Sequence, residues 1–531
     1  MVFDLVLRNV RVIDGCGNPW FRADIGVREG RVAAIGDLSA SPPPARLIEG
    51  RGLVAAPGFI DIHTHSDFSL LLDGLAQSKI RQGVTLELTN HCGGWAAPLV
   101  GASMDDARKH VVRYNPDFEI DWTDMAGFLA RMEREHTSVN VAALVGHGAV
   151  RGAVFGYEDR PPTPDELATM LRHIEDSMEA GAFGMSTGIY YAPGSYASLD
   201  ELAECCKVVA RYGGIHASHI RDESTYNIGL LASMEEIVEI ARRSSIKTEY
   251  VHVKCLGPGV WGLSGEIISR LEAARAAGID ITCDQYPYTA SGSSITGSLV
   301  PRWAQVGGRA GLVARLHDPE VRARMKKGIE ENYVRRGGPD RLVVALFPED
   351  KRFEGKPMSE VARIMGTDPA EAALIMLEQA DASFVSHVIN EEDLEAFMRY
   401  NPVMFGSDGS SLATTGPLSI GRPHPRNFGT FPRVLARYVR ERGTLSLPEA
   451  VRKMTSLPAQ RLGIRDRGAL REGYWADITV FDPATVQDNA TFENPLRYAS
   501  GIEYVIVNGE VVIEGGEHTG RKPGMVLRRT R

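Results

Sequence analysis

Two histidines stand two residues apart, directly after a short apolar run. The run reads PGFIDIHTH over residues 57–65, and the pair is His63 and His65. Alternate side chains of a β-strand share one face, so both imidazoles would point the same way. A strand that ends on two such imidazoles suits a divalent metal ion. Taken alone, the motif is equally compatible with a strand that carries two incidental histidines.

Other apolar runs farther along the chain end on similar polar residues. They are Cys92, His219, His252 and Asp408. Each type has an ordinary structural role: a lone buried histidine is usually a satisfied core residue, a buried cysteine usually packs inertly, and Asp before Gly usually marks a turn. The coincidence of imidazole, thiolate and carboxylate at matching places favours a metal-dependent catalytic site instead.

Further polar residues follow the same runs and could line a substrate pocket. Arg221 and Lys254 each lie two positions after a candidate histidine. Two cations beside a metal would suit a substrate carboxylate, and the alternative is a pair of solvated rim charges. The other pocket candidates are Tyr286, Tyr288, Ser293, Tyr190, Tyr191, Tyr196 and His147. We expect His147 to form pocket wall, with metal ligation as the alternative, and His91 to point away from the Cys92 face.

An alternation of strand and helix patterns between residues 57 and 469 would position these side chains. The strand candidates are residues 58–65, 84–92, 139–147, 182–188, 214–220, 248–254, 280–286 and 403–408. Eight parallel strands with crossover helices form a (β/α)8 TIM-like barrel, whose chemistry lies at the carboxyl ends of the strands. Residues 341–346 and 382–388 are alternative strand candidates. Residues 302–375 are charged and helical, and we expect them to form an inserted helical subdomain over the barrel mouth.

The two ends of the chain differ from the middle. Residues 1–56 and 470–531 alternate apolar and polar side chains, and Asn508-Gly509 between two such runs is typical of a hairpin turn. These patterns predict a small β-sandwich domain built from both termini. The expected fold class is therefore α/β, with this domain beside the barrel.

Composition excludes several classes of partner. The chain has 531 residues and a formal net charge of −9, which argues against nucleic acid or an anionic membrane surface. Six irregularly spaced cysteines do not form a disulfide framework and fit a reducing compartment. The apolar runs are too short to cross a membrane, and the N-terminus does not read as a secretion signal. We therefore expect a cytoplasmic protein with a small-molecule substrate, and the oligomeric state is left open.

With these motifs in view, the chain resembles the amidohydrolase superfamily and, within it, the N-acyl-D-amino-acid deacylases (D-aminoacylases). The resemblance is carried nearly end to end by PGFIDIHTH, AALVGHG (142–148), STG (186–188), PGSYA (193–197), SHIRDE (218–223), DQYPY (284–288), GSDG (406–409) and HPR (424–426). The paired histidines mark only the superfamily. The SHIRDE motif, and a cysteine in place of the usual carboxylated lysine, are specific to the subfamily.

The resemblance implies zinc-dependent hydrolysis of N-acyl-D-amino acids to a carboxylate and a free D-amino acid, with Asp408 as the general acid/base. It implies one tight zinc site made by Cys92, His219 and His252, and a second, weaker position near His63, His65 and Asp408. It also implies that Arg221, Lys254 and Tyr286 contact the substrate carboxylate or carbonyl. Ser293, Tyr191, His147 and Arg426 are further substrate-binding candidates.

The chain departs from the family pattern at three places. It reads TNHCG over residues 89–93 where the family usually has GNCG, it has Val251 where Ser is frequent, and residues 410–416 lengthen the segment that follows Asp408. We expect that segment near the substrate, where it would affect acyl and side-chain preference.

Two alternatives to a deacylase stay open. A dipeptidase or cyclic-amide hydrolase of the same superfamily would typically carry a lysine on the fourth strand, where this chain has Met185-Ser186-Thr187. A non-catalytic barrel scaffold would have lost ligands, and every expected ligand is present here.

Overall fold

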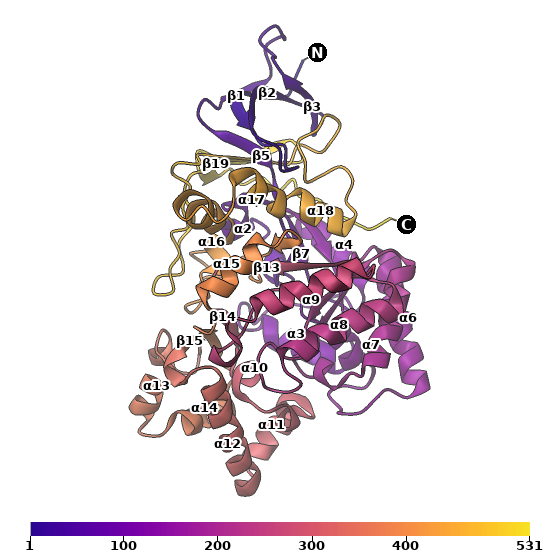
Figure 1. The fold of residues 1–531 in the computed structure, drawn as a ribbon, viewed down its shortest axis with the longest axis vertical. Coiled ribbons are helices and arrows are strands. Elements are labelled where there is room, and N and C mark those ends of the chain that lie inside the picture. The colour runs from indigo at the N-terminus through magenta and orange to yellow at the C-terminus, as the bar shows by residue number, and fades with distance from the viewer. Residues whose placement is uncertain (1, 531) are drawn as a thin grey trace.

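The computed structural model describes residues 2–530, and parallel strands alternating with helices form its centre (Figure 1). The central strands are β6 (Phe59–Asp61), β7 (Val84–Thr89), β8 (Asn140–Ala143), β9 (Val145–Gly146), β10 (Gly184–Gly188), β11 (Ile215–His219), β12 (Lys247–Tyr250), β13 (Ile281–Gln285) and β17 (Val403–Phe405). They hydrogen-bond in two arcs, β6-β7-β8 and β9-β10-β11-β12-β13-β17. One residue separates β8 from β9, and a parallel bridge between Thr64 and Gly409 joins the other two ends. The arcs therefore close into the expected α/β barrel.

Helices cover the outside of the barrel. They include α4 (Met125–Glu135), α6 (Pro164–Ala180), α7 (Leu199–Arg211), α8 (Leu230–Ser244), α9 (Ser264–Ala276), α15 (Glu391–Arg399) and α17 (Leu447–Met454). Shorter or more peripheral ones are α1 (Ser69–Leu72), α2 (Gln77–Ile80), α3 (Ala102–Val111), α5 (His147–Val154), α16 (Arg426–Arg433) and α18 (Ser456–Leu462).

Helix α6 illustrates how the sequence sets these elements. Thr163 and Glu166 form a reciprocal capping box at its start, and Gly181 ends it in the left-handed region at φ 113°. Met170, Ile174 and Met178 recur every four residues and are buried in the core around the barrel.

The segment between β13 and β17 forms a separate layer, seen at the lower end of Figure 1. Its helices are α10 (Ile295–Leu299), α11 (Gly308–Leu316), α12 (Pro319–Arg335), α13 (Met358–Met365) and α14 (Pro369–Gln379). Its strands β14 (Ser291–Ser294), β15 (Leu342–Leu346) and β16 (Ser383–Ser386) pair in an antiparallel sheet. The alternative strand candidates 341–346 and 382–388 therefore do contain strands, but these strands lie outside the barrel. These strands bury their apolar side chains in a core shared with α12–α14.

Strands from both ends of the chain join in one nine-stranded sheet at the opposite end of the molecule (Figure 1). They are β1 (Leu5–Val12), β2 (Phe21–Arg28), β3 (Arg31–Gly36), β4 (Arg46–Glu49) and β5 (Val54–Pro57), followed by β18 (Ile478–Phe481), β19 (Ile502–Val507), β20 (Glu510–Glu514) and β21 (Glu517–His518). Antiparallel pairing of β5 with β18 connects the two halves. The description of this unit as a sandwich stays a prediction.

Residues 525–529 return from this sheet to the barrel. The Val141 amide donates to the Met525 carbonyl over 2.9 Å, and the Leu527 amide donates to the Val141 carbonyl over 2.7 Å. The Arg529 amide donates to the Gly181 carbonyl, and its side chain donates to the carbonyls of Tyr212 and Leu462. We call residues 525–529 the C-terminal strap.

None of the helices in residues 2–530 is both long and apolar enough to cross a lipid bilayer.

Candidate metal centre

The predicted donors lie at or just beyond the carboxyl ends of their strands. His219 ends β11, while His63 and His65 follow β6 by a few residues. Cys92, His252 and Asp408 follow β7, β12 and β17, and all three adopt positive φ angles of 55°, 39° and 49°. Positive φ is unusual for residues with a side chain, and here it breaks the strand alternation where the chain turns inward.

A close approach of backbones surrounds the cysteine. An added Cβ at Gly188 would lie 2.1 Å from the Cys92 carbonyl oxygen, so β10 can pass beside Cys92 only because residue 188 is glycine.

Cys92, His219 and His252 converge on one point. The Cys92 Sγ lies 3.5 Å from His219 Nδ1 and 3.6 Å from His252 Nε2, and the two nitrogens are 3.0 Å apart. Zinc bonds of about 2.0–2.3 Å in tetrahedral geometry would separate such donors by about 3.3–3.6 Å. This trio therefore has approximately the spacing of three ligands to one metal ion.

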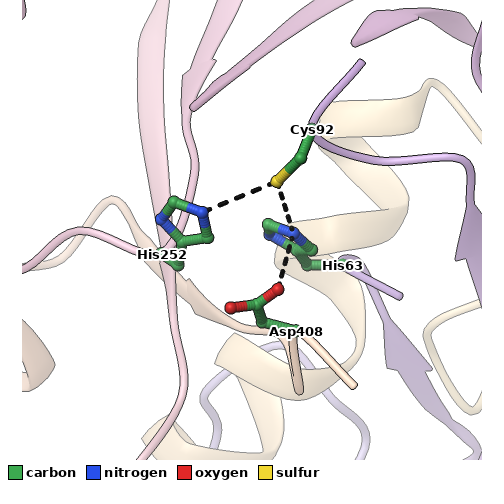
Figure 2. A group of neighbouring side chains, drawn as sticks. All are labelled: His63, Cys92, His252 and Asp408. Atoms are coloured by element: carbon green, nitrogen blue, oxygen red, sulfur yellow. Dashed lines mark hydrogen bonds and ion pairs between the residues drawn. The ribbon is translucent and has the colours of Figure 1, made fainter. Parts of the chain in front are cut away.

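His63 and Asp408 extend the cluster on its other side (Figure 2). The Cys92 Sγ lies 3.7 Å from His63 Nε2, which in turn lies 3.4 Å from Asp408 Oδ1. His65 Nε2 is 3.0 Å from the same carboxylate oxygen. Cys92 thus lies between two sets of donors, which is the arrangement that two neighbouring metal positions would need.

Burial and charge set the protonation of these groups. Burial holds the pKa of His219 and of His252 well below the usual range, so both imidazoles are neutral and keep a lone pair for a metal. Burial would raise the pKa of Asp408, but the charges of Arg426 and His63 and a hydrogen bond from His65 hold it well below its usual range. Burial raises the pKa of the Cys92 thiol, a shift that a bound cation would oppose.

Two carboxylates missed as site residues hold the histidines from behind. Asp284 lies 3.1 Å from His63 Nδ1 and accepts the His252 amide over 2.9 Å. Glu223 Oε1 lies 3.2 Å from His252 Nδ1 and 3.5 Å from His219 Nε2. Carboxylates on the outer nitrogens of ligating histidines fix ring orientation. Both residues stand within the DQYPY and SHIRDE motifs, so the motifs contain them without showing which atoms they contact.

The two cations expected to bind a substrate carboxylate are engaged by the protein. Lys254 Nζ forms an ion pair with Glu223 and lies 2.8 Å from His252 Nδ1. Arg221 pairs with Glu236 and donates to the Ser195 and Ala197 carbonyls. In these contacts both side chains support neighbouring residues, and their contact with substrate stays a prediction.

Other pocket candidates lie closer to Asp408. Arg426 Nη1 donates to Asp408 Oδ2 over 2.7 Å, and the Arg426 guanidinium lies 4.9 Å from the Tyr286 ring centre. The Tyr286 hydroxyl is buried and has no hydrogen-bond partner within residues 2–530. Tyr191 packs edge-on against His219, with its hydroxyl 3.4 Å from Ser293 Oγ. An unpartnered phenol and a guanidinium beside the donors are suited to polar groups of a substrate.

His147 contacts a buried carboxylate, and its role as pocket wall stays a prediction, while His91 lies closer to the site than expected. His147 starts α5, and its Nε2 lies 3.0 Å from Glu201, which also pairs with Arg151. His91 is fully buried and stacks on His63 at 4.1 Å, instead of pointing away from the site. The alternation used to place His91 ends at Thr89, because Asn90 and Cys92 both have positive φ.

Residues 410–416 pack against the protein body. The Leu412 and Ala413 side chains are 6% exposed and share a small core with Phe428, while the Ser411 amide donates to Ser66 Oγ. The segment thus braces the loop that follows His65, and its effect on substrate preference stays a prediction.

Comparison with known proteins places this geometry in context. A model described as the amidohydrolase family matches residues 46–262 and 355–513. A D-aminoacylase of Alcaligenes xylosoxydans xylosoxydans is 36% identical over 99% of this chain and 98% of its own length. The crystal structure of an N-acyl-D-glutamate deacylase from Bordetella bronchiseptica matches with a TM-score of 0.83 and 32% identity, over 99% of this chain and all of that one. That structure contains zinc and a phosphonate inhibitor that mimics the tetrahedral intermediate of its reaction. A D-aminoacylase structure described by its binuclear metal centre matches with a TM-score of 0.82 and 34% identity at the same coverage. Both the sequence and the fold therefore assign this chain to the amidohydrolase family.

Proposed function

We propose that this protein is a zinc-dependent deacylase that hydrolyses the amide bond of N-acyl-D-amino acids. The observation that carries the proposal is the convergence of Cys92, His219 and His252 beside the ionised carboxylate of Asp408. A soft thiolate with two imidazoles favours zinc over magnesium or calcium. The relatives named D-aminoacylase and N-acyl-D-glutamate deacylase support the same reaction class.

In this proposal the tight zinc site is Cys92, His219 and His252, and a second, weaker site involves His63, His65 and Asp408. The neutral imidazoles and the donor spacing fit the ion. A bound zinc ion activates water as a nucleophile and polarises the amide carbonyl. The Glu223 and Asp284 carboxylates keep the histidine rings oriented for this task.

Asp408 acts as the proton shuttle. Its Oδ1 faces His63 and His65, and Arg426 holds its Oδ2, so one oxygen stays aimed at the donor cluster. The carboxylate takes a proton from the attacking water and then gives it to the leaving amine nitrogen. The products are a carboxylic acid and a free D-amino acid.

The substrate carboxylate is bound near Arg426 and the free Tyr286 hydroxyl, with Lys254 and Arg221 as further candidates. Tyr191, Ser293 and His147 line the remaining wall in this proposal. A fixed carboxylate contact and a fixed carbonyl leave one direction for the α-substituent, so the two enantiomers cannot satisfy both contacts equally. We also propose that residues 57–469 form the catalytic unit and that residues 1–56 with 470–531 form its β partner.

The test compares N-acetyl-D- and N-acetyl-L-amino acids with zinc-loaded protein and with Cys92→Ala. We expect the D-forms to be cleaved much faster, and about one tightly held zinc per chain to be lost, together with activity, in Cys92→Ala. The matched control is Cys206→Ala, because Cys206 is fully buried on α7 among apolar residues. Equal rates for both enantiomers would contradict the substrate assignment, and full zinc occupancy in Cys92→Ala would contradict the metal assignment.

A further inference from the structure

A cleft apart from the metal centre lies where the inserted layer meets the barrel loops. It has a volume of about 550 Å³ and is walled by the loop after β11, by the segment after α10 and by one face of α12. Its volume is within the range of pockets that hold small organic ligands, roughly 300–1,000 Å³. None of the metal-centre donors lines it.

The lining is strongly basic. Its cations are Arg221, Arg302, Arg324, Lys327 and Arg335, and Glu331 is the only acid among the lining residues in 2–530. Glu236 neutralises Arg221, and Glu331 lies 3.7 Å from Arg335. The remaining three cations form no ion pair within residues 2–530. This concentration of positive charge stands out on a chain whose net charge is −9.

A buried arginine adds an uncompensated charge behind the cleft. Arg336 is 2% exposed, and its guanidinium donates to the hydroxyls of Tyr190 and Tyr226 and to the Ser298 carbonyl. Its Nη1 has no partner, and no carboxylate pairs with it, within residues 2–530. A buried cation with only neutral partners is costly, and a nearby anion would offset that cost.

The cleft is separated from the metal centre by one aromatic layer. The Tyr190 ring contacts both regions, because it lies 5.0 Å from the His219 ring and 4.3 Å from the Arg302 guanidinium. Tyr226 lines the cleft and hydrogen-bonds to Tyr190. A ligand in the cleft would therefore lie close to the metal centre without touching its donors, and Arg221 is the one candidate substrate contact that also lines the cleft.

We propose that this cleft is a second ligand site, which binds a small anion carrying two or more negative charges. The oxygens of the anion accept hydrogen bonds from Arg302, Arg324 and Lys327, and the charge of Arg336 stabilises it from behind. The chemistry fits either a phosphate compound or a polycarboxylate.

The test measures binding of pyrophosphate and of citrate to the full chain by isothermal titration calorimetry. We expect saturable binding of one of these probes, one per chain. The main variant is Arg324→Gln/Lys327→Gln, because both side chains are exposed on α12 and their loss removes charge without disturbing a core. Two lost charge-assisted hydrogen bonds should weaken binding at least about tenfold. Arg302→Gln, in the segment after α10, gives an independent measurement and should also weaken binding.

Two controls distinguish binding in the cleft from a general effect of charge and from binding at the metal centre. Arg172→Gln/Arg363→Gln removes two exposed cations elsewhere and should leave affinity within about twofold of the parent. Cys92→Ala should also retain binding, because the cleft does not use the metal site. Three results would overturn the proposal. They are loss of binding in Cys92→Ala alone, equal affinity in the cleft variant and its charge-matched control, and failure of both probes to saturate at millimolar concentration. A higher affinity for pyrophosphate than for citrate would identify the ligand as a phosphate compound, and the reverse as a polycarboxylate.

Discussion

Carboxylates behind the candidate metal centre contact the histidines that face it. His252 presents Nε2 to the cluster and Nδ1 to Glu223, while His63 presents Nε2 to the cluster and Nδ1 to Asp284. Each ring is thus fixed by a carboxylate, so the donor geometry exists before a metal binds. This arrangement leads to two predictions at the scale of single residues.

Asp408→Asn should lower kcat by roughly 10²–10⁴-fold, the usual value of general acid/base catalysis, because an amide cannot carry the proton. Zinc at the tight site and the melting temperature should change little, since Cys92, His219 and His252 remain. The measurement is kcat, zinc content and melting temperature on one preparation. A near-normal kcat in the folded, zinc-loaded variant would rule out the proton shuttle.

Glu223→Gln should weaken zinc binding about 10–100-fold, because the outer nitrogens of His252 and His219 lose their anionic partner. Competition with a chelator measures the affinity. The control is Glu236→Gln, which removes a carboxylate that pairs with Arg221 and contacts no metal-centre histidine. Equal zinc affinities for the two variants would show that Glu223 does not support the ligands.

The sequence identified residues that the structure brings together, but not the partners of these residues. His63, His65, Cys92, His219 and Asp408 could be found because each ends an apolar run, as does His252. The sequence could not predict that Lys254 pairs with Glu223 or that Arg221 pairs with Glu236, because these pairs depend on contacts between separate segments of the chain. The prediction that His91 points away from the site was wrong for a local reason, because the positive φ at Asn90 ends the strand alternation.

At the scale of elements, the barrel strands are shorter than the apolar runs that predicted them. Run 248–254 extends beyond β12, which ends at Tyr250, and run 84–92 extends beyond β7, which ends at Thr89. Apart from His219, which ends β11, the candidate metal donors lie among these excess residues, because a residue beyond the last ladder hydrogen bond can turn its side chain inward. The sheet formed by β14, β15 and β16 was harder to predict. Strands β15 and β16 contain apolar residues like barrel strands and differ from them in their antiparallel pairing, while β14 (SGSS) has no apolar side chain that would mark a strand.

Strand β7 carries a buried carboxylate that should make stability depend on pH. Burial raises the pKa of Glu87 to about 7, although Lys79 opposes the shift. Between about pH 4.5 and 7 the folded state holds a proton that the unfolded chain has lost, so this group's contribution falls as pH rises. The amide side chain of Glu87→Gln cannot ionise, so this variant does not lose stability as pH rises through this range. At pH 8 its free energy of unfolding should exceed that of the parent by at most about 3 kcal/mol.

Melting temperatures of both proteins at pH 5 and pH 8 test this expectation. The advantage of Glu87→Gln should grow between the two values. A difference that does not change with pH would mean that Glu87 ionises normally in the folded protein.

At the scale of the whole molecule, the C-terminal strap ties the barrel to residues remote in sequence. Deleting residues 525–531 removes the two backbone hydrogen bonds to Val141 and those that Arg529 makes to Gly181, Tyr212 and Leu462. At about 0.5–1.5 kcal/mol each, their loss should lower the free energy of unfolding by a few kcal/mol and reduce the melting temperature.

The control for this deletion is Arg528→Ala, which removes only an exposed ion pair with Glu133 and should be nearly neutral. Differential scanning calorimetry compares the two variants. Equal melting temperatures for the truncated chain and the parent would show that the strap does not stabilise the barrel.

Because β5 pairs with β18, the sheet can be completed only after both strands have been synthesised. Strands β1–β5 leave the ribosome before β18–β20, because β18 begins about 420 residues after β5 ends. At about 5–20 residues per second, that interval is on the order of 20–80 s. During it the nascent β5 strand has an open edge available to any other extended chain. Until β18 has been made, pairing with another extended chain at this edge therefore competes with the native pairing of β5.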